Sequence, residues 1–324
     1  MTRGRRTPVA LALGALLLAG CGTASGAVGG TAATDARPPA AGDVPVLVTA
    51  TPVPQLPVTV RGEDGREVTV TDVSRVVALQ GPVAETVVAL GLGDRLVARD
   101  ESTTFAEAAD LPVVSSGHTV SAEGVLAQRP TLVLTDARSG PPEALAALRA
   151  AGVAVVQVPE VWTLEGMAPR VRAVGAALGV PAAAEELVRA LGTPRAEPDP
   201  SGPRVAFLYL RGGAAVYLLG GEGSGADSLV EAAGGVDAGS ALGLDAFTPL
   251  TSESLVAAAP DVLLVMTKGL TPSAGSTGCS PCPASRRPPP AASVAWSRSR
   301  TGCCSRSART AAVIDRLRDG FGTA

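Results

Sequence analysis

Short apolar runs alternate with helical patterns along the first half of the chain. Val58 to Asp72 alternates apolar and polar residues around Glu63-Asp64-Gly65, which predicts a β-hairpin. Continuous apolar runs predict buried strands, and apolar residues at helical spacing after Pro or Ser predict helices. The strands expected are 75–79, 96–98, 131–135 and 153–158, and the helices are 82–91, 121–129 and 142–151. This alternation indicates parallel βαβ units with both sheet faces covered.

The alternation resumes in the second half, after a long helical stretch. Residues 163–191 keep a helical spacing that is interrupted at Gly179-Val180-Pro181, and a Pro-rich break follows at 194–203. Strands are then expected at 204–210, 215–219 and 261–266, and helices at 226–233, 252–259 and 310–318. The pattern predicts an α/β protein with two Rossmann-like lobes, 58–160 and 194–324, joined by a long backbone helix over 161–193.

An internal repeat supports two lobes of matched architecture. The segment from Ser121 to Leu134 aligns with the segment from Thr251 to Leu264, with Pro130 opposite Pro260. Each segment reads as a capped helix, a proline that ends it, and a buried strand. Any helix–proline–strand unit of an α/β protein has some of this character, but the equal length favours duplication or matched design.

The N-terminus has the features of a lipoprotein signal. Three arginines among the first six residues precede an apolar run over 9–18, and Leu18-Ala19-Gly20-Cys21 follows. A basic region, a short apolar region and small residues mark a secretory signal, here 1–20, and its apolar run is too short to span a bilayer. A cysteine in this place is expected to carry the lipid. Residues 21–57 are rich in Ala, Gly, Thr and Pro, which predicts a flexible tether on the outer face of the cytoplasmic membrane.

Composition narrows the candidate chemistry to very few side chains. Hydrophobic residues make up 46% of the 324 residues, but aromatic residues make up only 2%, so the core is expected to be aliphatic. A net charge of −3 gives no basic surface for nucleic acid. His118 is the only histidine, and Tyr209 and Tyr217 are the only tyrosines. A histidine alone in a loop, or a tyrosine alone in a strand, is more often structural than a ligand.

Four stretches resemble a known family. They run from Val97 to Phe105, from Ser116 to Leu126, from Phe207 to Gly213 and from Gly220 to Leu229. Together with the lipoprotein signal and the two lobes, they resemble substrate-binding proteins of the ABC importers for metal chelates, which are siderophores, cobalamin and heme. The resemblance spans roughly residues 66–270. It is strongest to the heme-binding lipoproteins of actinobacterial hemin importers.

The resemblance implies a class III periplasmic-binding-protein clamp that carries ferric heme to an ABC permease and its ATPase. In that family a histidine of the first lobe and a tyrosine of the second bind the heme iron from opposite faces, and these fall on His118 and Tyr209. An arginine two residues after the tyrosine, here Arg211, hydrogen-bonds the phenolate. Residues i and i+2 of a strand share a face, so Tyr209 and Arg211 are expected to project together. Phenolate favours ferric iron, and a guanidinium beside the oxygen favours its charged form.

Further residues are assigned from their positions in the chain. Arg99, Thr103 and Thr104 follow a strand and are candidates to bind the heme propionates. Tyr217 is the runner-up phenol for heme binding and is expected to pack near Tyr209. In the wider family a surface glutamate on each lobe docks on the permease, and Glu107 and Glu231 are the candidates here. We expect a monomer.

Two other functions stay open at this point. The same fold would serve a ferric siderophore or cobalamin, although siderophore pockets usually need several arginines or aromatic residues. A secreted hydrolase would have to use His118, and the chain has neither a Gly-x-Ser-x-Gly elbow nor catalytic zinc spacing. We therefore expect that the protein is not an enzyme.

Residues 272–307 differ from the rest of the chain. They are rich in Ser, Arg and Pro and carry four of the five cysteines, at Cys279, Cys282, Cys303 and Cys304. A zinc site or paired disulfides would suit an exported protein. We favour two compensating frameshifts, because a shifted reading of GC-rich codons restores an apolar helix-and-loop sequence there. Resequencing this segment distinguishes the two.

Overall fold

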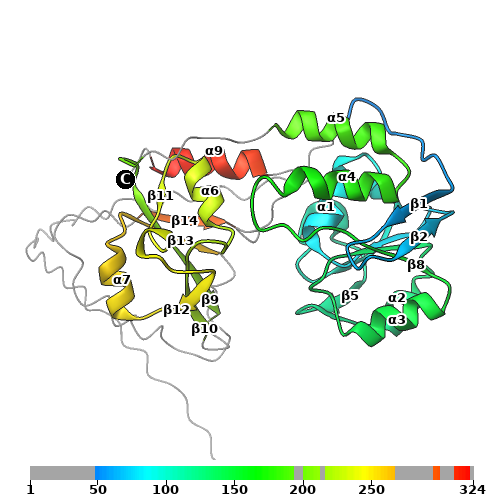
Figure 1. Cartoon of the computed structure of the whole chain (residues 1–324), viewed down its shortest axis with the longest axis horizontal. Coiled ribbons are helices and arrows are strands. Elements are labelled where there is room, and N and C mark those ends of the chain that lie inside the picture. The colour runs from blue at the N-terminus through cyan, green and yellow to red at the C-terminus, as the bar shows by residue number, and fades with distance from the viewer. Residues whose placement is uncertain (1–47, 193–199, 212–215, 267–294, 300–309, 322–324) are drawn as a thin grey trace, which may run out of the picture. The chain divides into compact units, whose positions relative to one another are not determined.

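The computed structural model describes residues 48–192, 200–211, 216–266, 295–299 and 310–321. They form two α/β lobes, which we describe separately (Figure 1). Among these described residues, no helix combines the length and the apolar character that a membrane crossing requires. The signal peptide, Cys21 and the four cysteines of 272–307 lie outside the described residues.

The N-terminal lobe is built on a six-stranded sheet of order β6-β5-β4-β3-β7-β8. Every neighbouring pair is parallel except β5 and β6, which form an antiparallel hairpin. Its strands are β3 (Val76–Ala78), β4 (Leu96–Asp100), β5 (Val113–Ser116), β6 (Thr119–Val120), β7 (Leu132–Thr135) and β8 (Ala154–Gln157). Four of these confirm the strands expected from sequence, whereas β5 and β6 were not expected.

Helices cover both faces of this sheet, as the apolar runs predict. Val76 and Ala78 of β3 pack in one core cluster with α1, and Val77 packs in another with α2 and α3. The helices are α1 (Gly81–Ala89), α2 (Ala122–Ala127) and α3 (Pro142–Ala150). The predicted hairpin is also present, as the antiparallel pair β1 (Val58–Arg61) and β2 (Glu67–Val70).

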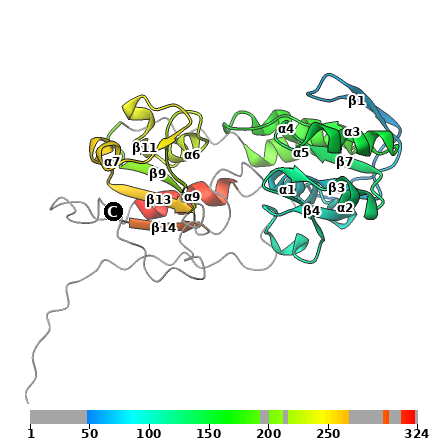
Figure 2. The ribbon, with the colours of Figure 1, turned by 90° about the horizontal axis from the view of Figure 1, so that it is seen from below.

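The predicted linking helix over 161–193 is two helices, α4 (Met167–Ala177) and α5 (Pro181–Leu191), which lie side by side in both views (Figures 1 and 2). Gly179 has a φ of 72° at the break, a conformation that glycine adopts without strain. Val174 of α4 and Leu187 of α5 both join the core cluster that contains β3. The expectation of one long helix was therefore wrong, because the chain turns back at this glycine instead of continuing.

The end of the predicted tether also packs on this lobe. Val48 is 8% exposed and joins the same core cluster. The Gln55 N–H donates to the Gly179 carbonyl at 2.8 Å. A Cβ on Gly179 would lie 2.6 Å from the Gln55 carbonyl oxygen, so this close crossing requires glycine. Residues 48–57 are therefore part of the lobe, which corrects the tether boundary.

The C-terminal lobe has a second six-stranded sheet, in which β12-β10-β9-β13-β14 follow one another and β11 pairs with the start of β9. Figure 2 shows β11, β9, β13 and β14 of this sheet. The pairs of β13 with β9 and with β14 are parallel, and β10 runs antiparallel between β9 and β12. The strands are β9 (Arg204–Arg211), β10 (Val216–Gly220), β11 (Val236–Asp237), β12 (Phe247–Pro249), β13 (Val262–Met266) and β14 (Ala295–Ser299). The helices are α6 (Asp227–Ala232), α7 (Ser252–Ala258) and α9 (Thr310–Phe321).

The internal repeat is confirmed in detail. The Ser121 side chain accepts from the Gly124 N–H at the start of α2, and Thr251 caps α7 in the same way. Each helix is followed by a left-handed residue directly before the proline, Arg129 with a φ of 47° and Ala259 with a φ of 41°. The strands that follow, β7 and β13, each lie between two other strands of their sheet.

Candidate functional site

His118 stands at the tip of the β5–β6 hairpin. Gly117 and His118 have φ values of 54° and 72°, and Ser116 pairs with Thr119 on either side. Two positive φ values in a two-residue loop are those of a type I′ turn, which matches the twist of the strands. The Glu101 carboxylate accepts from the Ser116 hydroxyl at 2.6 Å and from the Gly117 N–H at 2.8 Å. The Glu101 carboxylate therefore holds the turn in place, and His118 is exposed.

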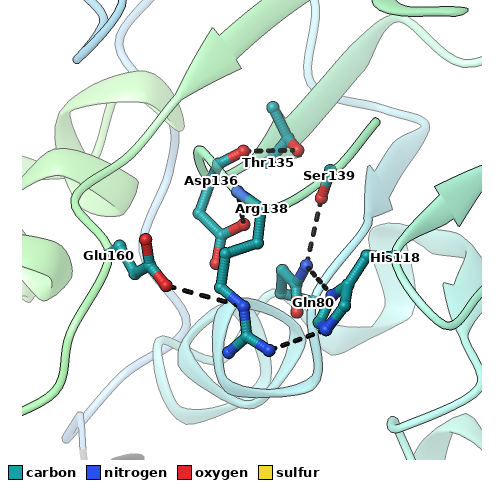
Figure 3. A network of polar contacts seen from close by, with 7 residues as sticks. All are labelled: Gln80, His118, Thr135, Asp136, Arg138, Ser139 and Glu160. Carbon is teal, nitrogen blue, oxygen red and sulfur yellow. Dashed lines mark hydrogen bonds and ion pairs between the residues drawn. The ribbon is translucent and has the colours of Figure 1, made fainter. Parts of the chain in front are cut away.

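Both ring nitrogens of His118 meet polar side chains (Figure 3). An Arg138 guanidinium nitrogen lies 2.6 Å from Nε2, and the Gln80 amide lies 3.4 Å from Nδ1 and 3.1 Å from the Ser139 hydroxyl. Arginine can only donate, so Nε2 accepts and the neutral ring carries its proton on Nδ1. It is the amide nitrogen of Gln80 that faces Nδ1 and donates to the Ser139 hydroxyl; the opposite amide orientation, with oxygen and nitrogen exchanged, would present an acceptor to the protonated Nδ1. Neutral imidazole with an outer partner on Nδ1 is the form in which histidine binds metals.

Arg138 is held on three further sides. Its Nε lies 3.5 Å from a Glu160 carboxylate oxygen, its guanidinium carbon lies 5.0 Å from the centre of the Trp162 ring, and its backbone N–H donates to Asp136 at 3.0 Å. Burial raises the pKa of Asp136. Burial, and then the charge of Asp136, raise the pKa of Glu160. Such contacts pre-position an arginine that points at the histidine.

The loop after β7 is tied to the histidine hairpin through the backbone. The Gly140 N–H donates to the His118 carbonyl at 2.9 Å, and the Val120 N–H donates to the Gly140 carbonyl at 2.7 Å. These bonds hold the loop that carries Arg138 and Ser139 beside His118, although β4 and β3 separate β7 from β5 in the sheet.

Tyr209 lies on β9 in an aromatic cluster of the C-terminal lobe. Its ring centre is 5.7 Å from that of Phe247, which in turn is 6.2 Å from that of Phe207, both in tilted geometry. Gly220 stands between Phe207 and Phe247 across the strands, and a Cβ there would lie 2.9 Å from the Phe207 ring. Tyr209 is half-buried, so one side of its ring is positioned by packing.

Tyr217 does not pack near Tyr209, which corrects the expectation from sequence. On the paired strand β10, Leu218 is opposite Tyr209 and Tyr217 is opposite Leu210. Directly opposed residues share a face, so Tyr217 projects from the other face of the sheet. It is 45% exposed there. Arg211 is the last residue of β9, two positions after Tyr209.

The loop after β4 uses its polar groups internally. The Arg99 guanidinium donates to the carbonyls of Thr103 at 2.8 Å and of Leu111 at 3.1 Å. Thr103 is 1% exposed, and its hydroxyl donates to the Asp100 carboxylate. These contacts argue against Arg99 and Thr103 as propionate ligands, because their donors hold the loop. Thr104 is exposed.

The two docking candidates differ in their surroundings. Glu107 is exposed on the short 3-10 helix η2 (Ala106–Ala108). Glu231 lies on α6 and is half-buried, and burial together with the nearby Asp227 and Asp237 raises its pKa.

Sequence reasoning missed Gln80, Arg138, Glu160 and Trp162. Three of them follow directly on β3, β7 and β8, at the carboxyl ends of parallel strands, where α/β sheets bind ligands. That rule would have found them. Within the described residues, no cluster of three or more His, Cys, Asp or Glu residues is arranged to hold a metal ion. Among the described residues, the N-terminal lobe offers one imidazole, His118, and the C-terminal lobe offers two phenols, Tyr209 and Tyr217.

Comparisons with known proteins agree with this fold. A search of curated proteins found no match. The solved heme-binding protein HmuT is similar with a TM-score of 0.72 and 29% identity over 86% of this chain and 94% of that one. It has also been solved with alanine in place of a histidine, of a tyrosine, and of an arginine two positions after that tyrosine.

Two further structures have higher identity. The periplasmic heme-binding protein RhuT from Roseiflexus sp. RS-1, in apo form, shares 34% identity over 77% of this chain and 98% of that one, with a TM-score of 0.63. BhuT, in complex with two hemes, shares 30% over 77% and 99%, also with a TM-score of 0.63. The family model described as periplasmic binding protein matches residues 76–278. The chain belongs to the periplasmic binding protein family and has its class III fold.

Proposed function

We propose that the chain captures ferric heme outside the cell and delivers it to an ABC permease for import. The observation that carries this proposal is the similarity over nearly the whole length of heme-binding periplasmic proteins, at 34% and 30% identity. A siderophore is not favoured, because the most similar structures named above are heme-binding proteins. Those proteins are binding proteins, and we extend this to the chain: it binds its ligand without chemical conversion.

The chemistry of each lobe supports heme. The Arg138 contact favours a neutral imidazole, whose Nε2 lone pair can bind iron. Tyr209 supplies a hard phenolate oxygen for the ferric state, with Arg211 two positions along the strand to pair with its charge. We assign these as the axial ligands and their support, so that one heme is held by both lobes. Thr104, which is exposed, is retained as a candidate propionate contact.

Titration of the exported domain with hemin tests this assignment. We expect a Soret shift and ferric bands on binding. His118→Ala and Tyr209→Phe are each expected to alter those bands and to weaken binding by about tenfold or more. Tyr217→Phe is the matched control, because it removes the other phenol from the opposite face, and it should leave the spectrum unchanged. Unchanged spectra in both ligand variants would refute the assignment.

Membrane anchoring and delivery are separate parts of the proposal. We assign Cys21 as the lipid-carrying residue of a monomeric protein on the outer face of the cytoplasmic membrane. Cys21→Ser is expected to release the protein from membranes. We assign Glu107 and Glu231 to permease docking, so Glu107→Gln should reduce heme import by cells while hemin binding by the isolated protein stays the same. Reduced binding, or full import, would contradict that role.

A further inference from the structure

Arg138 occupies the nitrogen of His118 that would bind iron. Its guanidinium donates to Nε2 at 2.6 Å, while Nδ1 faces Gln80. The network in Figure 3 holds the arginine there, through Glu160 at 3.5 Å from Nε and through the Asp136 carboxylate on its backbone. The contact is therefore built by several residues, and it is not the chance meeting of two surface side chains.

A single lone pair on Nε2 can serve only one partner. It accepts a hydrogen bond from Arg138 or it is donated to iron, and both cannot happen together. The other nitrogen is no substitute, because Nδ1 carries the proton of the neutral ring. Coordination by His118 therefore requires the arginine to leave Nε2. No proton is transferred in this exchange: one hydrogen bond breaks, and one coordinate bond forms.

We propose that Arg138 covers Nε2 of His118 in the heme-free protein and passes to a carboxylate of the incoming heme when His118 binds the iron. This rests on the proposed function. Arg138 is then both the group that closes the free site and a propionate ligand, the role that sequence reasoning gave to Arg99. The exchange therefore couples coordination of the iron by His118 to binding of a heme carboxylate by Arg138.

The surroundings of Arg138 suit this second role. The side chain is 40% exposed and Glu160 contacts Nε, so once Nη2 leaves His118 both terminal nitrogens can face a ligand. A planar guanidinium binds carboxylates through two parallel hydrogen bonds, which lysine cannot reproduce. The centre of the Trp162 ring lies 5.0 Å from the guanidinium carbon, so an apolar surface lies beside the charged group. Asp136 and Glu160 place negative charge beside Arg138 and hold the guanidinium in position.

Two ligands separate the two roles of the arginine. Hemin carries two free carboxylates, and hemin dimethyl ester has the same iron and ring without those charges. Arg138→Met removes the guanidinium and keeps an apolar chain against Trp162. We expect the ester to bind Arg138→Met more tightly than it binds the wild type, because nothing covers Nε2. We expect hemin to lose its advantage over the ester, so that the ratio of the two dissociation constants changes by about tenfold or more.

The ratio is insensitive to poor folding, because both ligands titrate the same preparation. Arg172→Met is the control: this arginine is 49% exposed, pairs with Glu185 at the surface, and should leave the ratio within about twofold. A ratio in Arg138→Met equal to that of the wild type would overturn the carboxylate role. No gain in ester affinity would overturn the covering role. If the wild type binds neither ligand, the proposed function itself fails, which is a different result.

Discussion

Replacing Gly175 by alanine should destabilise the N-terminal lobe, although alanine is the better helix former. The glycine lies on α4 where α5 crosses it. A Cβ at this position would lie 2.3 Å from the Cβ of Ala184, and the next obstacle, the Val180 carbonyl oxygen, is at 3.4 Å. Carbon atoms in contact prefer about 3.5–4.0 Å. The two helices would therefore have to separate by more than an ångström, or distort.

The magnitude follows from two opposing terms. Overpacking of this kind costs about 1–3 kcal/mol. Alanine returns about 0.8–1.0 kcal/mol through helix propensity. The expected net loss in the free energy of unfolding is up to about 2 kcal/mol. Gly320, on α9, is a matched control, because a Cβ there meets nothing within 4 Å. Gly320→Ala should leave stability unchanged or raise it by up to about 1 kcal/mol.

A double-mutant cycle isolates the contact. Urea unfolding followed by circular dichroism is measured for Gly175→Ala, for Ala184→Gly and for the pair. Ala184→Gly alone loses helix propensity, but it makes room for the new methyl group, so the pair should be more stable than the sum of the single effects by about 1–3 kcal/mol. A coupling below about 0.5 kcal/mol, or a Gly175→Ala protein as stable as the wild type, would refute the close packing of α4 on α5.

Three further changes test other parts of the chain. Arg75→Met removes a guanidinium that donates to the Gln128 carbonyl at 2.7 Å at the end of α2. The free energy of unfolding in urea is expected to fall by about 1–3 kcal/mol. An unchanged free energy would show that this contact does not stabilise the end of the helix. Burial raises the pKa of Asp237 above its ordinary 3.8, so the folded state binds the proton more readily and the free energy of unfolding falls as pH rises from 3.8 through the raised pKa. Asp237→Asn should remove that slope, and an unchanged slope would contradict the burial argument. Phe247→Leu should alter the hemin spectrum through Tyr209 and cost about 0.5–1.5 kcal/mol of aromatic packing, and an unaltered spectrum would mean that this ring does not position the phenol.

The elements that the sequence predicts well have local causes. Proline at the first or second position begins α1 and α3, and the Ser121 hydroxyl begins α2. Buried strands such as β7 are continuous apolar runs, because helices cover both of their faces. The short pair β5 and β6 lacks such a run. It depends on a left-handed turn at Gly117 and His118, which composition alone did not reveal.

The linking helix shows where local reasoning ends. The break at Gly179-Val180-Pro181 is visible in the sequence, but the letters do not say whether the helix axis continues or reverses. Reversal is favoured by contacts far apart in sequence, namely the packing of Gly175 on α5 and the crossing of Gln55 over Gly179. The same crossing explains why the predicted tether, 21–57, wrongly included residues 48–57.

The candidate site divides along a similar line. His118 and Tyr209 are conspicuous because their residue types are rare in this chain. Arg138, Gln80 and Glu160 belong to common types, and they meet only because β3, β7 and β8 are neighbours in the sheet. The position of Tyr217 was predicted wrongly because the register of two paired strands decides which of their residues lie on the same face of the sheet. The register puts it opposite Leu210.

The two lobes are alike at the amino ends of their central strands and differ at the carboxyl ends. In each lobe an arginine at the start of the first central strand, Arg75 or Arg204, donates to carbonyls at the end of the repeated helix. Each repeated helix ends in a left-handed residue before proline. At the carboxyl ends the match is lost: β3 has three residues and leads directly into α1, whereas β9 has eight and carries Tyr209 on its extension. Since α/β sheets bind ligands at these ends, two lobes of matched architecture that differ there can present different side chains, an imidazole on one and a phenol on the other.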